Sequence, residues 1–152
     1  MEVVFEYLFK ESNWSPVEYQ GKQVSISDTI NFSPGKMKFT ITFEKINSDW
    51  EQGIILKGKG VFFVNNQHIP KSICLWQKNS PKVVEFIFES KDGVLTIWNM
   101  WCIEKGPMQY GHNGAALYYE KISNGKRYYC NDGYPDDDFD DLIFTIEMHN
   151  TS

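Results

Sequence analysis

Apolar and polar side chains alternate with a period of two along much of this chain. Two runs are the strictest, and in each the apolar residues take every second position: Met37, Phe39, Ile41 and Phe43 in the first, and Leu142, Phe144, Ile146 and Met148 in the second. Successive side chains of a strand point to opposite faces, so this alternation predicts two half-buried strands, residues 37–44 and 142–149.

Weaker alternation predicts further strands. They are expected near residues 3–9, 24–26, 54–65, 72–78, 82–90, 94–104, 115–122 and 126–131. The segment 94–103 is apolar on both faces, as in a central strand that is covered on both sides. Gly58 and Gly60 interrupt the 54–65 run and predict a β-bulge or a sharp bend there.

Short turn signals separate these runs at Pro34-Gly35, Asp92-Gly93 and Asn124-Gly125, and the last two suit tight hairpins. No segment of ten or more residues shows a convincing helical period. The chain of 152 residues has the size of one domain. We therefore expect residues 1–152 to form a single all-β domain, an antiparallel β-sandwich or barrel of about nine to ten strands, mostly connected by hairpins.

Composition excludes several classes of function. The net charge of −5 argues against general nucleic-acid binding. No apolar run approaches the roughly 20 residues of a membrane span, so no membrane contact is expected. The first residues mix acids with apolar side chains and lack the basic start of a signal peptide. Three widely spaced cysteines favour reduced thiols in a cytoplasmic protein.

The acidity of the chain is concentrated in one segment. Six aspartates fall within residues 132–141, and from Asp132 to the end the charge is −7, since Glu147 is the one further acid and no Lys or Arg follows. The rest of the chain has 15 basic and 13 acidic side chains, or +2. Carboxylates packed this densely repel one another, so the fold must solvate them or neutralise them. Three interpretations are open.

The first interpretation is a metal site. Calcium takes six to eight oxygen ligands, chiefly carboxylates and backbone carbonyls. Asp132, Asp136, Asp138 and Asp140 are the candidate ligands for Ca²⁺. The spacing is not that of an EF-hand, and adjacent acids point in different directions, so only two or three could reach one ion.

The segment Asp138-Phe139-Asp140-Asp141-Leu142-Ile143-Phe144 resembles the D-[FY]-[ND]-D-[LIV]-[VI]-F motif at the end of certain bacterial β-sandwich domains with acidic, calcium-associated loops. This resemblance covers about ten of the 152 residues. It implies a metal-binding or fold-closing role for the loop, and no activity.

The second interpretation is a structural loop. Aspartate side chains accept hydrogen bonds from nearby backbone N–H groups and so lock loops into Asx-turns. Phe139 would then insert into the core between exposed acids. The last strand would start from a loop that is fixed by its own side chains.

The third interpretation is a docking surface for a basic protein partner. Concentrated negative charge attracts basic partners and can mimic a nucleic-acid backbone. The residues expected to make this contact are Asp136, Asp137, Asp138, Asp140, Asp141, Tyr134 and His112. Small, acidic, β-rich immunity proteins, which block a toxin nuclease at its basic active site, have this size and charge.

Catalysis is the weakest reading of the sequence. His112 could act as a general base and Cys130 or Cys102 as a nucleophile, with Asp132 or Asn113 as the orienting group. No family signature surrounds these residues, and a cysteine at strand spacing is more often a buried small side chain. Tyrosines 118, 119, 128 and 129 pair across a predicted hairpin and could present an aromatic strip to a protein or a carbohydrate. The sequence thus favours a non-catalytic binding module that requires no cofactor.

Overall fold

The computed structural model describes residues 2–150, and these residues form an all-β fold with one short helix. In chain order the elements are α1 (Phe5–Glu11), β1 (Val17–Tyr19), β2 (Lys22–Val24), β3 (Asp28–Asn31), β4 (Gly35–Ile46), β5 (Glu51–Val64), β6 (Gln67–Trp76), the 3₁₀ turn η1 (Gln77–Asn79), β7 (Val83–Ser90), β8 (Val94–Cys102), β9 (Met108–Gln109), β10 (Ala116–Ile122), β11 (Gly125–Asn131) and β12 (Leu142–His149). All strand pairs are antiparallel. The predicted fold class is confirmed.

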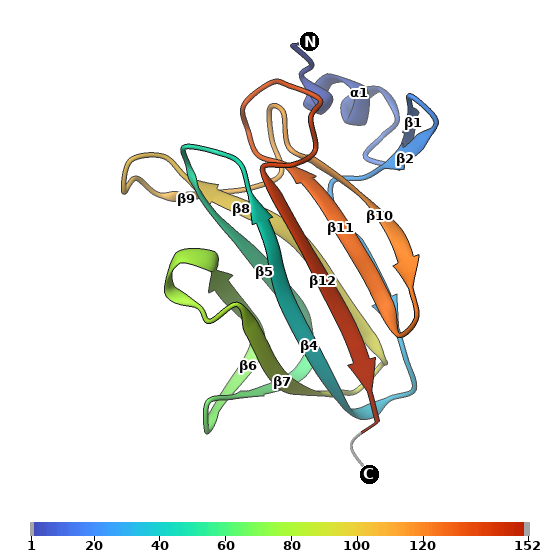
Figure 1. The fold of residues 1–152 in the computed structure, drawn as a ribbon. Coiled ribbons are helices and arrows are strands. Elements are labelled where there is room, and N and C mark those ends of the chain that lie inside the picture. Colours follow the sequence, from blue (N-terminus) through green and yellow to red (C-terminus); the bar gives the residue numbers. More distant parts are fainter. Residues whose placement is uncertain (1, 151–152) are drawn as a thin grey trace.

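Ten of the strands form one sheet in the order β10-β11-β12-β4-β7-β5-β8-β3, with β6 beside β5 and β9 beside β8. This sheet curls into a half-barrel (Figure 1). Its two ends approach each other, because Ser25 bridges to Leu117 and Asp28 accepts hydrogen bonds from Lys126 Nζ at 2.8 Å and Tyr128 Oη at 2.6 Å. The strands β1 and β2 form a small separate ribbon beside α1.

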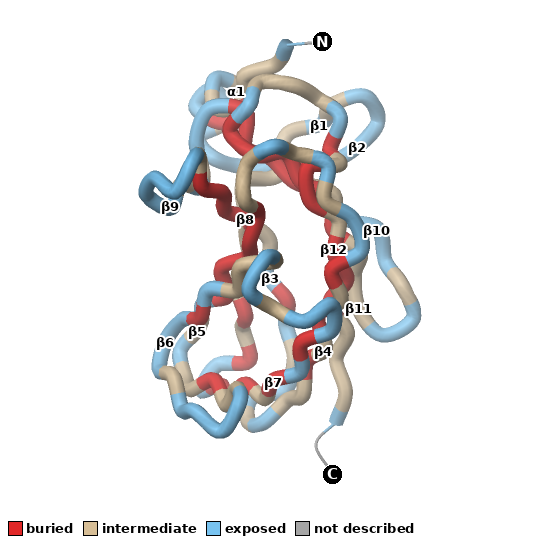
Figure 2. The backbone as a smooth tube through the Cα atoms, turned by 60° about the vertical axis from the view of Figure 1, so that its left-hand side comes forward, coloured by how far each residue is buried: buried red, intermediate tan, exposed pale blue. Residues whose placement is uncertain are grey.

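The main hydrophobic core lies within the curl of the sheet, where buried segments of several strands face one another (Figure 2). The strands predicted from strict alternation supply much of it. Phe39, Ile41 and Phe43 of β4 are buried, and β12 spans the predicted residues 142–149. The period-two pattern therefore located both the strands and their inward faces.

The predicted strand at residues 3–9 is wrong, because this segment forms α1. Phe5 and Phe9 are fully buried and lie on one face of the helix, while Tyr7 between them is 66% exposed. Residues spaced four apart share a helix face as well as a strand face, so the alternation alone did not decide between the two. The predicted strand at 24–26 ends at Val24, so Ile26 lies outside it.

The predicted hairpin at Asp92-Gly93 is also wrong. Strands β7 and β8 both pair with the same edge of β5, one after the other. Gly60 of β5 lies opposite Ser90 of β7, and Lys57 of β5 lies opposite Thr96 of β8. The 91–93 turn therefore carries the chain onward and does not reverse it. The hairpin predicted at Asn124-Gly125 is confirmed, since it joins β10 to β11.

A β-bulge bends β5 where Gly58 and Gly60 predicted one. The pairing with β6 shifts between Lys57 and Val61, so residues 58–60 of β5 lie opposite the single residue Lys71. Lys71 has a φ of 72°, in the left-handed region that side chains rarely adopt. A Cβ on Gly60 would collide with the backbone carbonyl of Glu89, which explains the need for glycine at this position.

Candidate functional site

The acidic loop, residues 132–141, leaves β11 and returns to β12 at the end of the sheet that also carries α1 (Figure 1). Asn131 is fully buried and holds this loop with two hydrogen bonds. Its side-chain Oδ1 accepts the N–H of Phe139 at 2.7 Å, and its Nδ2 donates to the carbonyl of Asp136 at 2.9 Å. Phe139 is 2% exposed and its ring packs against Phe5 and Tyr118. The loop is thus anchored near its C-terminal end by an aromatic side chain, as the structural interpretation predicted.

Asp132 is engaged inside the protein and is 1% exposed. Its Oδ2 accepts hydrogen bonds from Ser48 Oγ at 2.7 Å and Gln52 Nε2 at 2.9 Å. Its Oδ1 accepts the N–H of Tyr134 at 3.0 Å, which is an Asx-turn. These three donors replace the water that burial removes from the carboxylate.

Asp141, at the other end of the loop, is 6% exposed, and its Oδ2 accepts the backbone N–H of Asp132 at 2.9 Å. Burial, and then the negative charges of Asp132 and Asp136, raise the pKa of Asp141 to about 8, although the backbone hydrogen bond opposes the shift. Burial also raises the pKa of Asp136, and neighbouring aspartates add to the effect. Both carboxyl groups therefore lie where negative charge is unfavourable.

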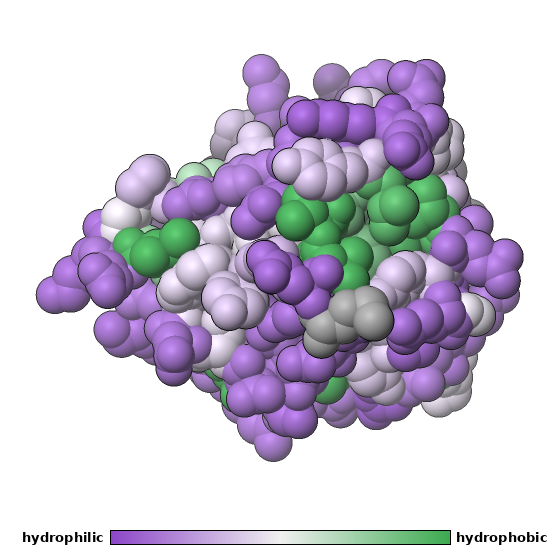
Figure 3. Space-filling model, turned by 90° about the horizontal axis from the view of Figure 1, so that it is seen from above, coloured by the Kyte–Doolittle hydropathy of each residue, from purple (hydrophilic) through white to green (hydrophobic). Residues whose placement is uncertain are grey.

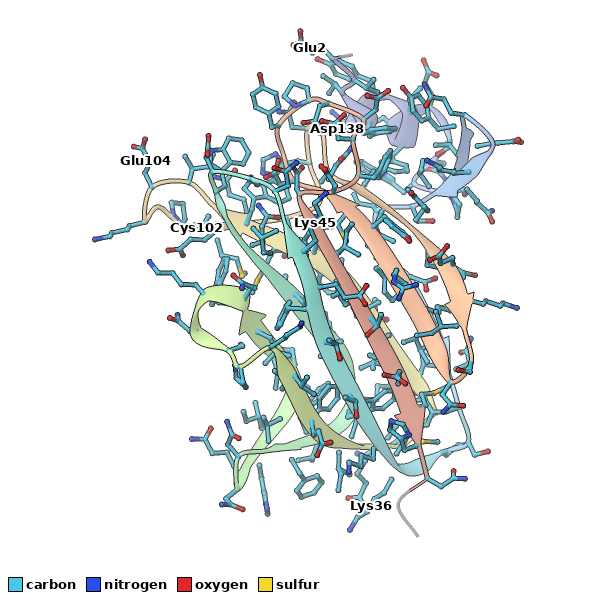
Figure 4. The ribbon with its side chains drawn as sticks, in the orientation of Figure 1. Glu2, Lys36, Lys45, Cys102, Glu104 and Asp138 are labelled. Atoms are coloured by element: carbon cyan, nitrogen blue, oxygen red, sulfur yellow. The ribbon has the colours of Figure 1, made fainter. Side chains whose placement is uncertain are left out.

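The remaining acids of the loop face outward. Asp137 accepts a hydrogen bond from Tyr19 Oη at 2.9 Å, and Asp140 accepts one from Asn47 Nδ2 at 2.9 Å and pairs with Lys45 at 3.4 Å. Asp138 is exposed at the outer end of the loop, and Lys45 lies below the loop (Figure 4).

A cavity of about 300 Å³ opens between the acidic loop and the segment 47–50. We call it the acidic notch. It is lined by Asn47, Ser48, Asp49, Trp50, Asp132, Tyr134, Asp136 and Asp141. The rings of Trp50 and Tyr134 meet edge to face at 6.2 Å between centroids, and Tyr134 is 59% exposed. Aromatic side chains thus stand beside carboxylates at its surface.

The carboxylates of the acidic notch lack a positive counter-charge. Among residues 2–150, no Lys, Arg or His side chain lies within 4.0 Å of the carboxylates of Asp132, Asp136 or Asp141. The nearby Lys45 pairs with Asp140, which is outside the lining of the notch. The notch therefore combines buried negative charge with an opening through which a cation can enter.

The structure brings together only part of each predicted residue set. Of the four predicted metal ligands, Asp132 and Asp136 line the notch, while Asp138 and Asp140 do not. Within the described part of the chain, no group of three or more His, Cys, Asp or Glu side chains could hold a metal ion. Of the predicted docking residues, Tyr134, Asp136 and Asp141 line the notch. Asp137, Asp138, Asp140 and His112 lie outside it.

The candidate catalytic residues His112 and Cys130 have different surroundings. Cys130 is fully buried in the core, and burial raises the pKa of its thiol well above the usual range. His112 is exposed, with its ring against Trp101 at 5.3 Å. Cys102 donates a hydrogen bond to the carbonyl of Gly106. Among residues 2–150, no hydrogen bond joins His112 to either cysteine.

The predicted tyrosine strip is largely covered. Tyr128 is buried in the core, and Tyr118 stacks on Tyr129 at 4.8 Å beside the residues of α1. Tyr119, 39% exposed, lies under the ammonium group of Lys126, which is 4.0 Å from the ring centroid. Tyr134, which is not part of this strip, is 59% exposed at the acidic notch.

Sequence reasoning missed the segment 47–50 and a second, larger cavity. Asn47 to Trp50 follow a predicted strand and lie more than 80 residues from the acidic loop, as the separation of 84 between Ser48 and Asp132 shows. The second cavity, about 820 Å³, lies at the β5 bulge and contains four lysines. The paired glycines 58 and 60 were the one available signal, because a bulge re-aims neighbouring side chains.

Comparisons with protein-family models, with curated proteins and with solved structures found no match to this chain. The resemblance of residues 138–144 to calcium-associated β-sandwich domains therefore stays a prediction. None of the helices formed by residues 2–150 has the length and apolar character that crossing a membrane requires.

Proposed function

We propose that this protein is a non-catalytic binding module whose acidic notch receives a basic side chain, arginine or lysine, of a protein partner. The observation that carries this proposal is the uncompensated charge of the notch. Asp132, Asp136 and Asp141 line one cavity with no cationic side chain of residues 2–150 beside them, and the pKa values of Asp136 and Asp141 are raised. Perturbed carboxyl groups in a cavity are a recognised feature of functional sites.

Burial, and then the charges of neighbouring aspartates, raise these pKa values, and a cation in the notch would oppose both effects. A positive charge within about 4–6 Å favours the ionised carboxyl group. Binding would therefore deprotonate Asp141 and release a proton at neutral pH. The affinity for the cation should consequently rise with pH up to the pKa of about 8 that Asp141 has in the free protein.

The size and the walls of the notch favour an organic cation. A volume of about 300 Å³ is at the lower limit for a small-molecule site, and it suits one long side chain. A guanidinium group pairs with carboxylates through two parallel hydrogen bonds, and both guanidinium and ammonium groups are attracted to aromatic rings. Trp50 and Tyr134 supply such rings at the entrance.

The surroundings of the notch add long-range attraction. Asp49 and Asp138 are exposed near it, and the face that includes this end of the molecule is mostly hydrophilic around a smaller hydrophobic area (Figure 3). Exposed charge of one sign accelerates association with a partner of the opposite sign. A basic toxin or nuclease belongs to this partner class. The free thiols of Cys74, Cys102 and Cys130 fit a reducing compartment, so we propose a cytoplasmic partner.

A labelled hexa-arginine peptide tests the proposal by fluorescence anisotropy at low ionic strength. We expect Asp136→Asn to weaken binding roughly tenfold, since it removes a poorly solvated charge. The matched control is Asp138→Asn, which makes the same charge change in the same loop but outside the notch and should weaken binding less than roughly twofold. Asp141→Asn should weaken binding more at pH 9 than at pH 6.

Equal losses in the Asp136 and Asp138 variants would contradict the proposal, because they would show non-specific attraction to the whole loop. Thermal melts with millimolar calcium and with a chelator test the metal alternative. A calcium-dependent rise in Tm that Asp132→Asn and Asp136→Asn abolish would replace the docking proposal with a metal site.

A further inference from the structure

A second candidate binding site lies at the bulge of β5, in the cavity of about 820 Å³ that we call the lysine pocket. It is lined by residues 57–61 of β5, by Pro70 and Lys71 of β6, by Lys91 and Asp92 of the β7–β8 connection, and by Val94, Thr96 and Trp98 of β8. The pairing of β5 with β6 shifts at this point, which opens the outer face of the sheet. The pocket exists because Gly58 and Gly60 let the strand bend.

Four lysines line the lysine pocket, and none has a partner among residues 2–150. Lys57, Lys59, Lys71 and Lys91 make no side-chain hydrogen bond, ion pair or cation–π contact with residues 2–150. One acid, Asp92, also lines the pocket, and its Oδ1 accepts hydrogen bonds from Ser90 Oγ and the Val94 N–H. The lining therefore carries a net charge of +3 in a protein whose net charge is −5.

The walls between these lysines are apolar. Val61, Pro70, Val94 and Trp98 contribute side chains to the pocket. The Trp98 ring also contacts Tyr110 at 5.7 Å, and Tyr110 is 47% exposed, so the apolar surface continues toward the 106–114 loop. Apolar walls with a small number of charged groups are the usual composition of small-molecule sites, and the volume lies within their range.

We propose that the lysine pocket binds a small amphipathic anion, with an apolar body against Trp98 and Val94 and a carboxylate, sulfate or phosphate head among the lysines. The unpaired ammonium groups specify the charge of the ligand, and the apolar walls specify its body. A purely polar polyanion would leave the apolar walls of the pocket exposed to solvent. The pocket is separate from the acidic notch, because the two cavities share no lining residue and Lys57 follows Trp50 by seven residues, roughly 23 Å at the rise of a strand.

Titration calorimetry with four probes tests both halves of this proposal: octanoate, dodecanoate, dodecyltrimethylammonium and pyrophosphate, each below its aggregation concentration. Dodecanoate should bind saturably with one molecule per chain. Its affinity should exceed that of octanoate by roughly fourfold for each additional methylene that is buried. Dodecyltrimethylammonium and pyrophosphate should bind at least roughly tenfold more weakly, because each lacks one of the two required features.

Variants then assign the binding to this pocket. The double variant Lys57→Gln/Lys71→Gln should weaken dodecanoate binding roughly tenfold at low salt, and added salt should reduce this difference. Lys82→Gln/Lys105→Gln is the matched control, since both lysines are exposed, lie outside the pocket and form no ion pair with residues 2–150. In NMR spectra the indole N–H signal of Trp98 should shift on binding, while signals of the acidic notch should not.

Several results would overturn the proposal. Absence of saturable dodecanoate binding would contradict it. Dodecyltrimethylammonium binding as tight as dodecanoate binding would also contradict it. Equal weakening by the pocket and control variants would show attraction to overall charge. Pyrophosphate binding as tight as dodecanoate binding would instead indicate a polyanion site. None of these outcomes bears on hexa-arginine binding at the acidic notch, so the two proposals fail separately.

Discussion

The acidic loop and the lysine pocket concentrate charge in opposite ways. In the loop, the acids are adjacent in sequence, and the fold gives hydrogen-bond donors to many of them: Asp132 has three, Asp137 has Tyr19, and Asp140 has Asn47 and Lys45. In the pocket, the lysines are spread from Lys57 to Lys91 and none has a partner within residues 2–150. The acidic loop is therefore visible in the sequence as a run of acids, whereas the lysines of the pocket come from separate segments of the sequence.

The number of charged residues in a sequence segment therefore does not measure how much of that charge is available for binding. A buried carboxylate must find donors, so the loop uses its own backbone and nearby side chains to satisfy Asp132. An exposed lysine has water and needs no partner. Of the six aspartates in this segment, three line the acidic notch, and none of these three pairs with a cationic side chain of residues 2–150.

The largest expected effect comes from removing the anchor of the acidic loop. Phe139→Ala should lower the free energy of unfolding by about 3–5 kcal/mol, because it deletes a buried ring packed against Phe5 and Tyr118. Lys57→Ala in the lysine pocket should change it by less than about 0.5 kcal/mol. Urea denaturation of both variants measures the contrast. Similar values would show that the two regions do not differ in structural role.

A smaller loss is expected from filling the bulge under the lysine pocket. Gly60→Ala should cost about 1–3 kcal/mol, since its Cβ would collide with the backbone of Glu89. Lys59→Ala, one residue away with an exposed side chain, is the control and should be nearly neutral. Denaturation midpoints compare the two. A neutral Gly60→Ala would mean that the bulge is not what shapes the pocket.

The raised pKa of Asp141 makes stability depend on pH. Above the ordinary Asp pKa of about 4 the unfolded chain has lost this proton, while the folded protein keeps it up to a pH of about 8. The folded state then binds more protons, so stability should fall as the pH rises from about 4 to 8. Asp141→Asn should flatten this decline and raise the free energy of unfolding at pH 8 by about 1–2 kcal/mol. Asp138→Asn should leave the fall in stability with pH unchanged. Thermal melts of both variants across this pH range test the difference.

The smallest effect is expected from relieving repulsion in the lysine pocket. Lys71→Gln or Lys91→Gln should stabilise the fold by a few tenths of a kcal/mol at low salt, roughly the value of an exposed charge pair. The gain should vanish near 1 M salt, where the screening length is about 3 Å. Thermal melts at low salt and near 1 M salt measure this gain in stability. Destabilisation by either change would reveal an ion pair that holds the pocket together.

Local patterns explain which parts of the fold were predictable. Strict alternation fixed β4 and β12 because one face of each strand is buried, and the Asx-turn at Asp132 and the insertion of Phe139 follow from local chemistry. Helix α1 was missed because Phe5 and Phe9 fit both periods. The Asp92-Gly93 turn was misread because β5 bends, so that two strands share one of its edges.

The sites themselves depend on contacts between residues distant in sequence. The acidic notch needs Ser48 and Trp50 beside the acidic loop, and the lysine pocket needs β5, β6 and β8 at one bulge. No single segment carries either pattern. The sequence could indicate the loop and the bulge, and only the arrangement of strands could show which charges lack partners.

The most direct test is an NMR titration of the ¹⁵N-labelled protein with hexa-arginine peptide at pH 8 and low salt. We expect amide shifts concentrated at residues 47–50, 132–136 and 141, with Asp138 and the lysine pocket little affected. Shifts that instead follow the density of acids, greatest at Asp137 and Asp138, would contradict it, as would a titration without saturable shifts.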